Sequence, residues 1–445
     1  TKIGMNDNFF ELGGHSLLAM RLAMALRCDV RTIMVNPTVS SLLEHLSDNV
    51  DAIDTAMDAL IETLAESDNM TKHEQRILFM HLLDPNSNSY NMPFHVQFRK
   101  SIDVRANLAV VLESLSILRT RFADGKATSD VAVNIADLQE GDIDVFAPFD
   151  LERGPLCRFA VDEEKNIVKG SIHHSIADGR SMEVLLEAIR TGVVQESTKA
   201  FSVRKYAALE ASTEMVDKYA ASAEEWKRIL GDTPPRLEVD FAPNSSLATL
   251  APSTIGDDDQ ARSSSSSLPR NSAVTLDAAT VTSLRSFCRE KGISMFSAAL
   301  SILHHSMRAY SREAFAVGVA HDARPRQFRD TVGMFVNTVL VPFKGGTDGG
   351  CETVQDLHRR WTNDILQHAT APYDMVSSMG YGCNVYLAFN VGILGTDDDA
   401  GTSRMNGGAE DKNSMDSNMP YRSLASDDEF LSEHNTTTSA KFDLS

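Results

Sequence analysis

The segment from residue 167 to residue 189 constrains the fold of this chain most strongly. An apolar stretch at 167–172 runs into a polar turn, and apolar residues then recur at helical spacing, at Met182, Leu185, Leu186 and Ile189. A strand, a turn and a helix in succession indicate an α/β scaffold. The turn lies at the end of the strand, where binding and catalytic sites tend to be built.

That turn carries two adjacent histidines and an acid. His173 and His174 are followed by Asp178 and Gly179 in the run Ser-Ile-His-His-Ser-Ile-Ala-Asp-Gly-Arg. Two imidazoles with a carboxylate at a fixed offset can position and deprotonate an attacking nucleophile, and glycine permits a tight turn. The sequence therefore makes His173, His174, Asp178 and Gly179 candidate catalytic residues.

A second pair of histidines provides a control within the same chain. His304 and His305 lie in a segment with the pattern of a helix, and Ala309 stands where an acid would be needed. Two adjacent histidines alone are therefore weak evidence for catalysis. We interpret the second pair as structural.

Composition excludes several other classes of function. The net charge of −20 over 445 residues argues against a nucleic-acid partner, because phosphate binding needs clustered Lys and Arg. No apolar run approaches the ~20 residues that span a bilayer, so we expect no membrane partner. Five scattered cysteines, with no Cys-x-x-Cys and no Cys/His ligand spacing, indicate neither a metal site nor a disulfide framework. We expect a reducing compartment, the cytoplasm.

Near the start of the chain, Ser16 opens an amphipathic helix after Gly13 and Gly14. The glycines allow a tight backbone turn, and the helix N-terminus would stabilise an attached phosphate. For Gly-Gly-x-Ser alone, a simple N-cap is the favoured reading.

The residues around Ser16 distinguish these readings. The run Asp-Asn-Phe-Phe-Glu-Leu-Gly-Gly-His-Ser-Leu at 7–17 closely resembles the attachment site of peptidyl carrier (thiolation) domains of nonribosomal peptide synthetases, and Asn-Pro-Thr-Val at 36–39 resembles the start of that family's last helix. The resemblance implies that Ser16 carries covalent 4'-phosphopantetheine, added by a phosphopantetheinyl transferase. It implies a small all-α unit, a partial helical bundle that lacks the family's first helix.

The pattern at 173–179 resembles the active-site motif of condensation domains, which belong to the chloramphenicol-acetyltransferase-like superfamily. Further stretches resemble the family's motifs in the expected order: Thr71 to Phe79 with 90–93, Leu118 to Phe122, 148–151 with 154–156, Val332 to Thr338, His368 to Asp374, and Ala440 to Leu444. The resemblance therefore runs from residue 71 to residue 445. It implies an α/β fold of two similar lobes in a V shape, with the histidine motif facing a channel between them.

The resemblance also implies a reaction and roles. An acceptor aminoacyl amine would attack a donor phosphopantetheinyl thioester and form an amide. His174 would orient or deprotonate the amine, while Asp178 would hold the turn and pair with Arg324, with Arg326 as the competing partner. The implied partners are donor and acceptor carrier domains and the neighbouring synthetase domains.

We expect the following organisation: carrier unit 1–48, truncated at its N-terminus; helical linker 49–70; N-lobe 71–235; inter-lobe linker 236–267; and C-lobe 268–445, truncated at its C-terminus, with a mobile insertion at about 394–439. Helices are expected at 103–121, 278–291 and 294–310, and strands at 314–319, 336–343 and 384–390.

The chain departs from the condensation-domain pattern in places. Glu74 replaces the usual Gln of the first motif, Ser114-Leu115-Ser116 replaces Arg-His-Glu, and the motif near Tyr206 is weak. These changes affect expectations about substrate preference and local stability more than about the reaction.

Three alternatives stay open. An epimerisation domain that follows a carrier usually pairs with Gly-Gly-Asp-Ser, whereas this chain has His15. A terminal cyclising or ester-forming domain usually lacks the histidine pair. A non-catalytic carrier-docking module would keep the fold alone.

Overall fold

The computed structural model describes residues 4–10, 12, 22, 26, 30–43, 51–138, 143–233, 276–308, 313–344, 352–387 and 421–423. Ser16, the expected inter-lobe linker and the motif at 440–444 lie outside the described residues. We refer to residues 71–233 as the first half of the condensation region and to residues 276–387 as the second half.

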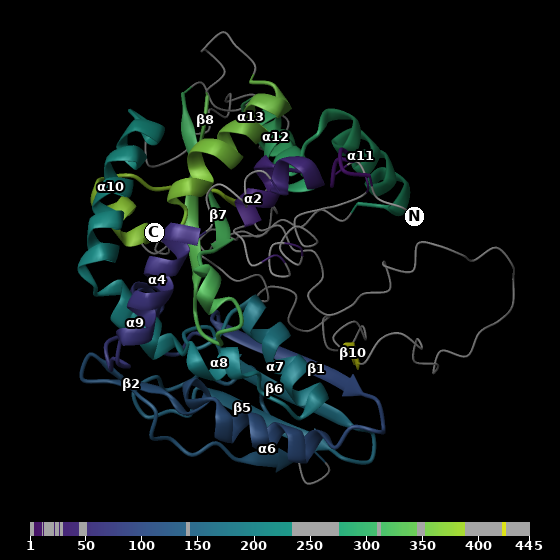
Figure 1. Cartoon of the computed structure of the whole chain (residues 1–445). Helices are drawn as coiled ribbons and strands as arrows, with labels where there is room; N and C mark the ends of the chain where they lie inside the picture. The colour runs from purple at the N-terminus through teal and green to yellow at the C-terminus, as the bar shows by residue number, and fades with distance from the viewer. Residues whose placement is uncertain are drawn as a thin grey trace, which may run out of the picture.

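The first half is built on a mixed sheet with strand order β10-β1-β6-β5-β4. Its strands are β1 (Asn91–Phe98), β4 (Ile135–Asp137), β5 (Cys157–Asp162), β6 (Ile167–His173) and β10 (Tyr421–Ser423). Only β4 and β5 run parallel among the described pairs of this sheet. Helices α6 (Val104–Ser114) and α7 (Gly179–Thr191) pack against each other beside the sheet (Figure 1).

The second half contains a sheet of order β8-β7-β9. Its strands are β7 (Phe315–Asp322), β8 (Val336–Phe343) and β9 (Tyr386–Leu387), and helices α12 (Met295–Arg308) and α13 (Val354–Arg360) pack beside it. A Cβ at Gly318 would lie 2.6 Å from Cys383 Sγ, so only glycine allows this approach of β7 to its neighbours.

The remaining elements are α2 (Val30–Val35), α4 (Asp51–Thr63), α5 (Lys72–Leu83), η1 (Ser116–Arg119), β2 (Arg121–Ala123), β3 (Lys126–Thr128), α8 (Glu196–Ala200), α9 (Val203–Glu210), α10 (Thr213–Leu230), α11 (Ala278–Lys291), η3 (Arg326–Phe328), η4 (Trp361–Ile365), η5 (Leu366–His368) and α14 (Tyr373–Ser378). Helix α4 occupies the segment expected to be a helical linker. In the described part of the chain, no helix is long and apolar enough to cross a membrane.

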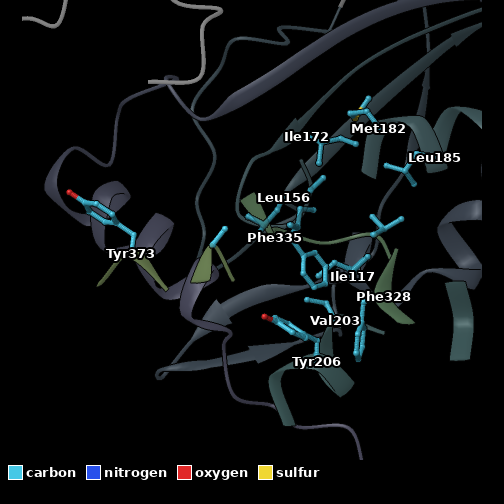
Figure 2. Close-up of a cluster of buried hydrophobic side chains, with 14 of the residues drawn as sticks. Ile117, Leu156, Ile172, Met182, Leu185, Val203, Tyr206, Phe328, Phe335 and Tyr373 are labelled. Carbon is cyan, nitrogen blue, oxygen red and sulfur yellow. The ribbon is translucent and has the colours of Figure 1, made fainter. Parts of the chain in front are cut away.

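One hydrophobic core joins the two halves. Figure 2 shows Tyr206 of α9 together with Phe328 and Phe335 of the second half. The Tyr206 ring centroid lies 5.2 Å from that of Phe328 and 4.8 Å from that of Phe335. Such aromatic pairs add ~0.5–1.5 kcal/mol each beyond burial. The core therefore fixes the segment 328–335 against the first half.

One expectation about secondary structure was wrong. The helix expected over 103–121 ends at Ser114, because Leu115 has extended backbone and a 3₁₀ turn, Ser116–Arg119, follows it. Leu115 and Leu118 are both buried, and the three-residue period of the turn also suits apolar residues three apart. Within the stretch expected to be mobile, residues 421–423 form β10, which pairs with β1. The edge of β1 offers unpaired backbone groups to such a strand.

Candidate active site

The turn that follows β6 is fixed by backbone hydrogen bonds from both sides; we call residues 173–178 the histidine turn. The amide of His173 donates to Leu156 O, and that of His174 donates to Tyr90 O, each at 2.8 Å. The apolar strand β6 thus ends where the sequence indicates, and α7 begins directly after Asp178.

His174 is held as a neutral base. Its side chain is buried, and its Nδ1 lies 2.9 Å from Ala177 O. A carbonyl oxygen only accepts, so Nδ1 carries the proton and Nε2 carries the lone pair. Burial lowers the pKa of His174, while Asp178 opposes this shift. At neutral pH the ring can therefore accept a proton at Nε2.

His173 is held in the opposite tautomer. Its Nδ1 accepts from the amide of Ser175 at 3.3 Å and lies 2.8 Å from Ser175 Oγ. Rings pack edge-on against it, with the centroid of His81 at 5.7 Å and that of Phe149 at 5.8 Å. Burial lowers its pKa well below the usual value. These contacts are those of a packed side chain that shapes the turn.

Asp178 forms a bidentate ion pair with Arg324. The guanidinium nitrogens lie 2.6 Å and 2.8 Å from the carboxylate oxygens, and both side chains are almost completely buried. Burial alone would raise the pKa of Asp178, but Arg324 and the hydrogen bonds hold it below its usual value. The expected contact is thus present, and Arg326, the competing candidate, is half-exposed in η3.

The same carboxylate accepts further hydrogen bonds from both halves. It caps α7 by accepting from the Ser181 amide at 3.0 Å, and it accepts from the Phe335 amide at 3.0 Å. Ser181 Oγ lies within 2.9 Å of both Asp178 Oδ1 and Gly333 O. Asp178 is therefore fully occupied in holding the turn against the second half.

The role expected for Gly179, permitting a tight turn, stays a prediction. Gly179 opens α7, and among the described glycines it is not one with a positive φ. Helical backbone at this position is open to any residue. Its role here therefore does not come from left-handed backbone.

Helix α5 connects the first motif to the second half. Arg76 donates to Val336 O at 2.8 Å and lies 3.4 Å from Asn337 Oδ1. Asn337 Nδ2 in turn donates to the carbonyls of Ala369 and Ala371. Arg76 is buried, and it acts electrostatically on His174. The first motif thus lies against the same second-half segment that holds Asp178.

In the carrier segment, two of the motif stretches lie side by side. Asn8 forms a β-bridge with Thr38, and the Phe9 amide donates to Pro37 O at 2.6 Å. The side chains of Phe10 and Ile33, in the same segment, are buried. Ser16 lies outside the described residues, so the attachment serine stays a prediction.

Comparison with family models assigns both regions. The model described as "Condensation domain" matches residues 67–378. The chain belongs to the condensation domain family. The model described as "Phosphopantetheine attachment site" matches residues 1–46, so the chain carries an attachment site for that group ahead of its condensation domain.

Large synthetases contain similar segments. Bacitracin synthase 3 of Bacillus licheniformis is 25% identical over 371 residues, which cover 76% of this chain and 6% of that protein. Cyclosporin synthetase of Tolypocladium inflatum is 25% identical over 412 residues, which cover 85% of this chain and 3% of that protein. The chain thus spans a small fraction of the length of these curated relatives.

Solved structures show the same fold. The X-domain from teicoplanin biosynthesis matches with a TM-score of 0.52 and 17% identity, over 72% of this chain and 74% of that one. The first condensation domain of the calcium-dependent antibiotic synthetase matches with a TM-score of 0.51 and 15% identity, over 72% and 80%. The mixed α/β content is therefore that of the condensation-domain fold.

The departure at Glu74 has a partner in this condensation domain. Glu74 closes a capping box with Thr71 and forms a buried ion pair with Arg204 of α9. A glutamine could cap the helix but would leave the Arg204 guanidinium without its carboxylate, and a buried charge is costly without a partner. The substitution in the first motif is thus balanced by a basic residue distant in the sequence.

Sequence reasoning missed several residues that organise the condensation domain. Arg76 lay inside the first motif but was not singled out, and Ser181 follows Asp178 at the position that an N-cap usually bonds. That spacing could have identified Ser181. No local signal identifies Arg204, whose contact to Glu74 joins residues 130 apart.

Proposed function

We propose that this chain is a carrier–condensation didomain of a nonribosomal peptide synthetase that forms an amide bond. The observation that carries the proposal is the fixed tautomer of His174, whose Nδ1 donates to Ala177 O at 2.9 Å while Nε2 keeps its lone pair. A neutral, oriented imidazole in the matched family is suited to receive a proton from an attacking amine.

The proposed step balances without a further reactant. The nitrogen of the acceptor aminoacyl group attacks the carbonyl carbon of the donor thioester, a C–N bond forms and the C–S bond breaks. His174 Nε2 receives or orients the amine proton, and the leaving thiolate takes up a proton. When bound, phosphopantetheine supplies the thiol that carries each acyl group as a thioester. Asp178 and Arg324 hold the turn and transfer no proton, and His173 packs behind it.

The proposal includes finer features of architecture and partners. The two halves correspond to two lobes in a V shape, with the histidine turn facing a channel between them. Its supports are the two separate sheets and the cross-half contacts of Asp178. Donor and acceptor carrier domains would reach this channel from neighbouring parts of a synthetase. The scattered cysteines support a cytoplasmic location.

Product detection tests the reaction. Donor and acceptor carriers loaded with aminoacyl pantetheine are mixed with the protein, and the acceptor is examined by intact mass for gain of the donor acyl group. We expect a product whose new amide bond survives mild hydroxylamine, which cleaves the thioester and so releases the product from the acceptor carrier. An ester would indicate the ester-forming alternative, inversion of the donor without transfer would indicate epimerisation, and no change would leave a docking module.

Loading of Ser16 is tested separately. Incubation with CoA and a promiscuous phosphopantetheinyl transferase should add the mass of phosphopantetheine, and Ser16→Ala should abolish the gain. Loading at another serine would overturn the assignment of Ser16 while leaving the condensation reaction intact.

A further inference from the structure

One buried histidine near the histidine turn has no role in the reaction described above. His73 lies in the first turn of α5 with its side chain 1% exposed. Its Nε2 is buried and has no hydrogen-bond partner among the described residues. A buried polar atom without a partner destabilises a fold. His73 lies on the same helix as His81, whose ring packs against His173 of the histidine turn.

Its place on α5 puts His73 alongside the turn. His73, Ile77 and His81 are four residues apart and therefore share one face of the helix. At the far end of this face, His81 packs against the His173 ring at 5.7 Å. In the middle, Ile77 packs with Tyr90, whose carbonyl accepts from the His174 amide. This face of α5 thus meets the histidine turn directly at His81 and, through Tyr90, at Ile77.

The charges around His73 are those that surround His174. Asp178 and Arg76 act electrostatically on both rings, and Arg324 acts on His73 as well. Burial, followed by Arg76, lowers the pKa of His73 to about 3, so the ring is neutral at any working pH. In the tautomer that carries its proton on Nε2, the neutral ring beside guanidinium groups favours a ligand atom with partial negative charge, such as a carbonyl oxygen.

We propose that His73 is a substrate-positioning residue, whose buried Nε2–H donates a hydrogen bond to the carbonyl oxygen of the thioester-bound acyl group. This inference rests on the proposed function, because the acyl group is the substrate of that reaction. The bond would orient the carbonyl relative to the proton acceptor on His174. His73 would complete a site to which α5 and the histidine turn both contribute.

The test measures the coupling between His73 and the carbonyl. Binding of pantetheine thioesters of glycine, leucine and phenylalanine is compared by calorimetry with that of S-alkyl pantetheines, in which CH₂ replaces the carbonyl. The wild-type chain should bind the thioester more tightly by about 10-fold, the value of one hydrogen bond of ~1.4 kcal/mol. His73→Ala should abolish this preference, and His73→Gln, which keeps a donor, should restore part of it.

A matched control comes from α12. His304 is also buried with an unpartnered ring nitrogen, its Nδ1, but it lies beside Phe343 and Lys344. His304→Ala should keep the carbonyl preference. Melting temperature separates a structural role: His73→Ala should not melt lower than His304→Ala, since the His304 variant also loses the hydrogen bond from Nε2 to Lys344 O at 3.1 Å.

The possible outcomes separate the two proposals. Amide formation by the wild type with an unchanged carbonyl preference in His73→Ala would overturn the role of His73 and leave the proposed function in place. A preference that depends on His73 without any amide product would support recognition by His73 and overturn the reaction. Absence of both binding and product would overturn both.

Discussion

The two histidine pairs of this chain have the same dipeptide and different surroundings. His173 and His174 lie where a strand passes into a turn, and both side chains are buried. His304 and His305 lie on α12, where neighbouring residues are about 100° apart, so His304 is buried and His305 exposed. The backbone, not the residue type, decides whether two imidazoles can serve one site.

The hydrogen bonds of the two pairs differ in the same way. In the first pair, Nδ1 of His174 donates to Ala177 O, while Nδ1 of His173 accepts from Ser175. In the second pair, His304 stacks on Phe343 with ring centroids 4.5 Å apart, and His305 Nδ1 donates to Ser301 O at 2.7 Å. The second pair is used in packing, in a bond from His305 to its own helix and in a bond from His304 Nε2 to Lys344 O at 3.1 Å.

His174→Ala should have the largest effect among the variants that distinguish the two histidine pairs. We expect a loss of about 10²–10⁴ in kcat/KM for amide formation, the usual contribution of a positioned acid–base group. The fold should persist, since alanine keeps the backbone bond to Tyr90 O. Condensation rate and far-UV circular dichroism measure the two effects. Full activity in a folded His174→Ala protein would show that the turn positions the substrate by other groups.

The next effect concerns the pair that holds the turn. Asp178→Ala should lower the free energy of unfolding by ~3–5 kcal/mol, because it leaves Arg324 buried without its carboxylate. Denaturant unfolding of Asp178→Ala, Arg324→Ala and the double variant measures this. The double variant should cost much less than the sum of the singles. The cycle of Asp178 with the half-exposed Arg326 is the control and should be additive. Additivity with Arg324 would reopen a direct proton-transfer role for Asp178.

Acid should weaken activity only below pH 6.5. Burial lowers the pKa of His174, so its base form persists to a pH below the ordinary value of a histidine. The acid limb of the kcat/KM profile should therefore lie below pH 6.5. A limb above that value would contradict a buried His174 as the proton acceptor.

The free energy of unfolding should also decrease in acid. The pKa of His73 is lowered to about 3, so between about pH 6.5 and pH 3 the folded state binds fewer protons than the unfolded state. The free energy of unfolding should fall as pH falls through this window, by at most ~1.4 kcal/mol per pH unit for each such histidine. His73→Gln should reduce the slope, and an unchanged slope would contradict burial of a neutral ring.

The sequence predicted what lies within a few residues of the motif. The end of β6 and the start of α7 both follow from the strand, turn and helix pattern of residues 167–189. The contact of Asp178 with Arg324 spans 146 residues and came from the family resemblance alone.

Other features depend on contacts that no local pattern records. Arg76 contacts Val336 across 260 residues, and β10 pairs with β1 from a stretch whose composition indicated mobility. The unpartnered Nε2 of His73 is visible only once α5 is placed against the turn. Burial and pairing at long range are properties of the packed chain, and periodicity within one segment does not contain them.

The smallest expected effect completes the comparison of the two pairs. His305→Ala should change the free energy of unfolding by less than ~0.5 kcal/mol, as for most exposed positions away from special features. Its Nδ1 donates to Ser301 O, one turn earlier on the same helix, at 2.7 Å. Alanine also has the higher helix propensity, which offsets the lost bond. Condensation activity per folded molecule should equal that of the wild type, with His174→Ala measured beside it. If both variants lost activity equally, the assignment of the active histidine to the turn after β6 would have no support, since only the turn and not α12 is held by Asp178 and Arg324.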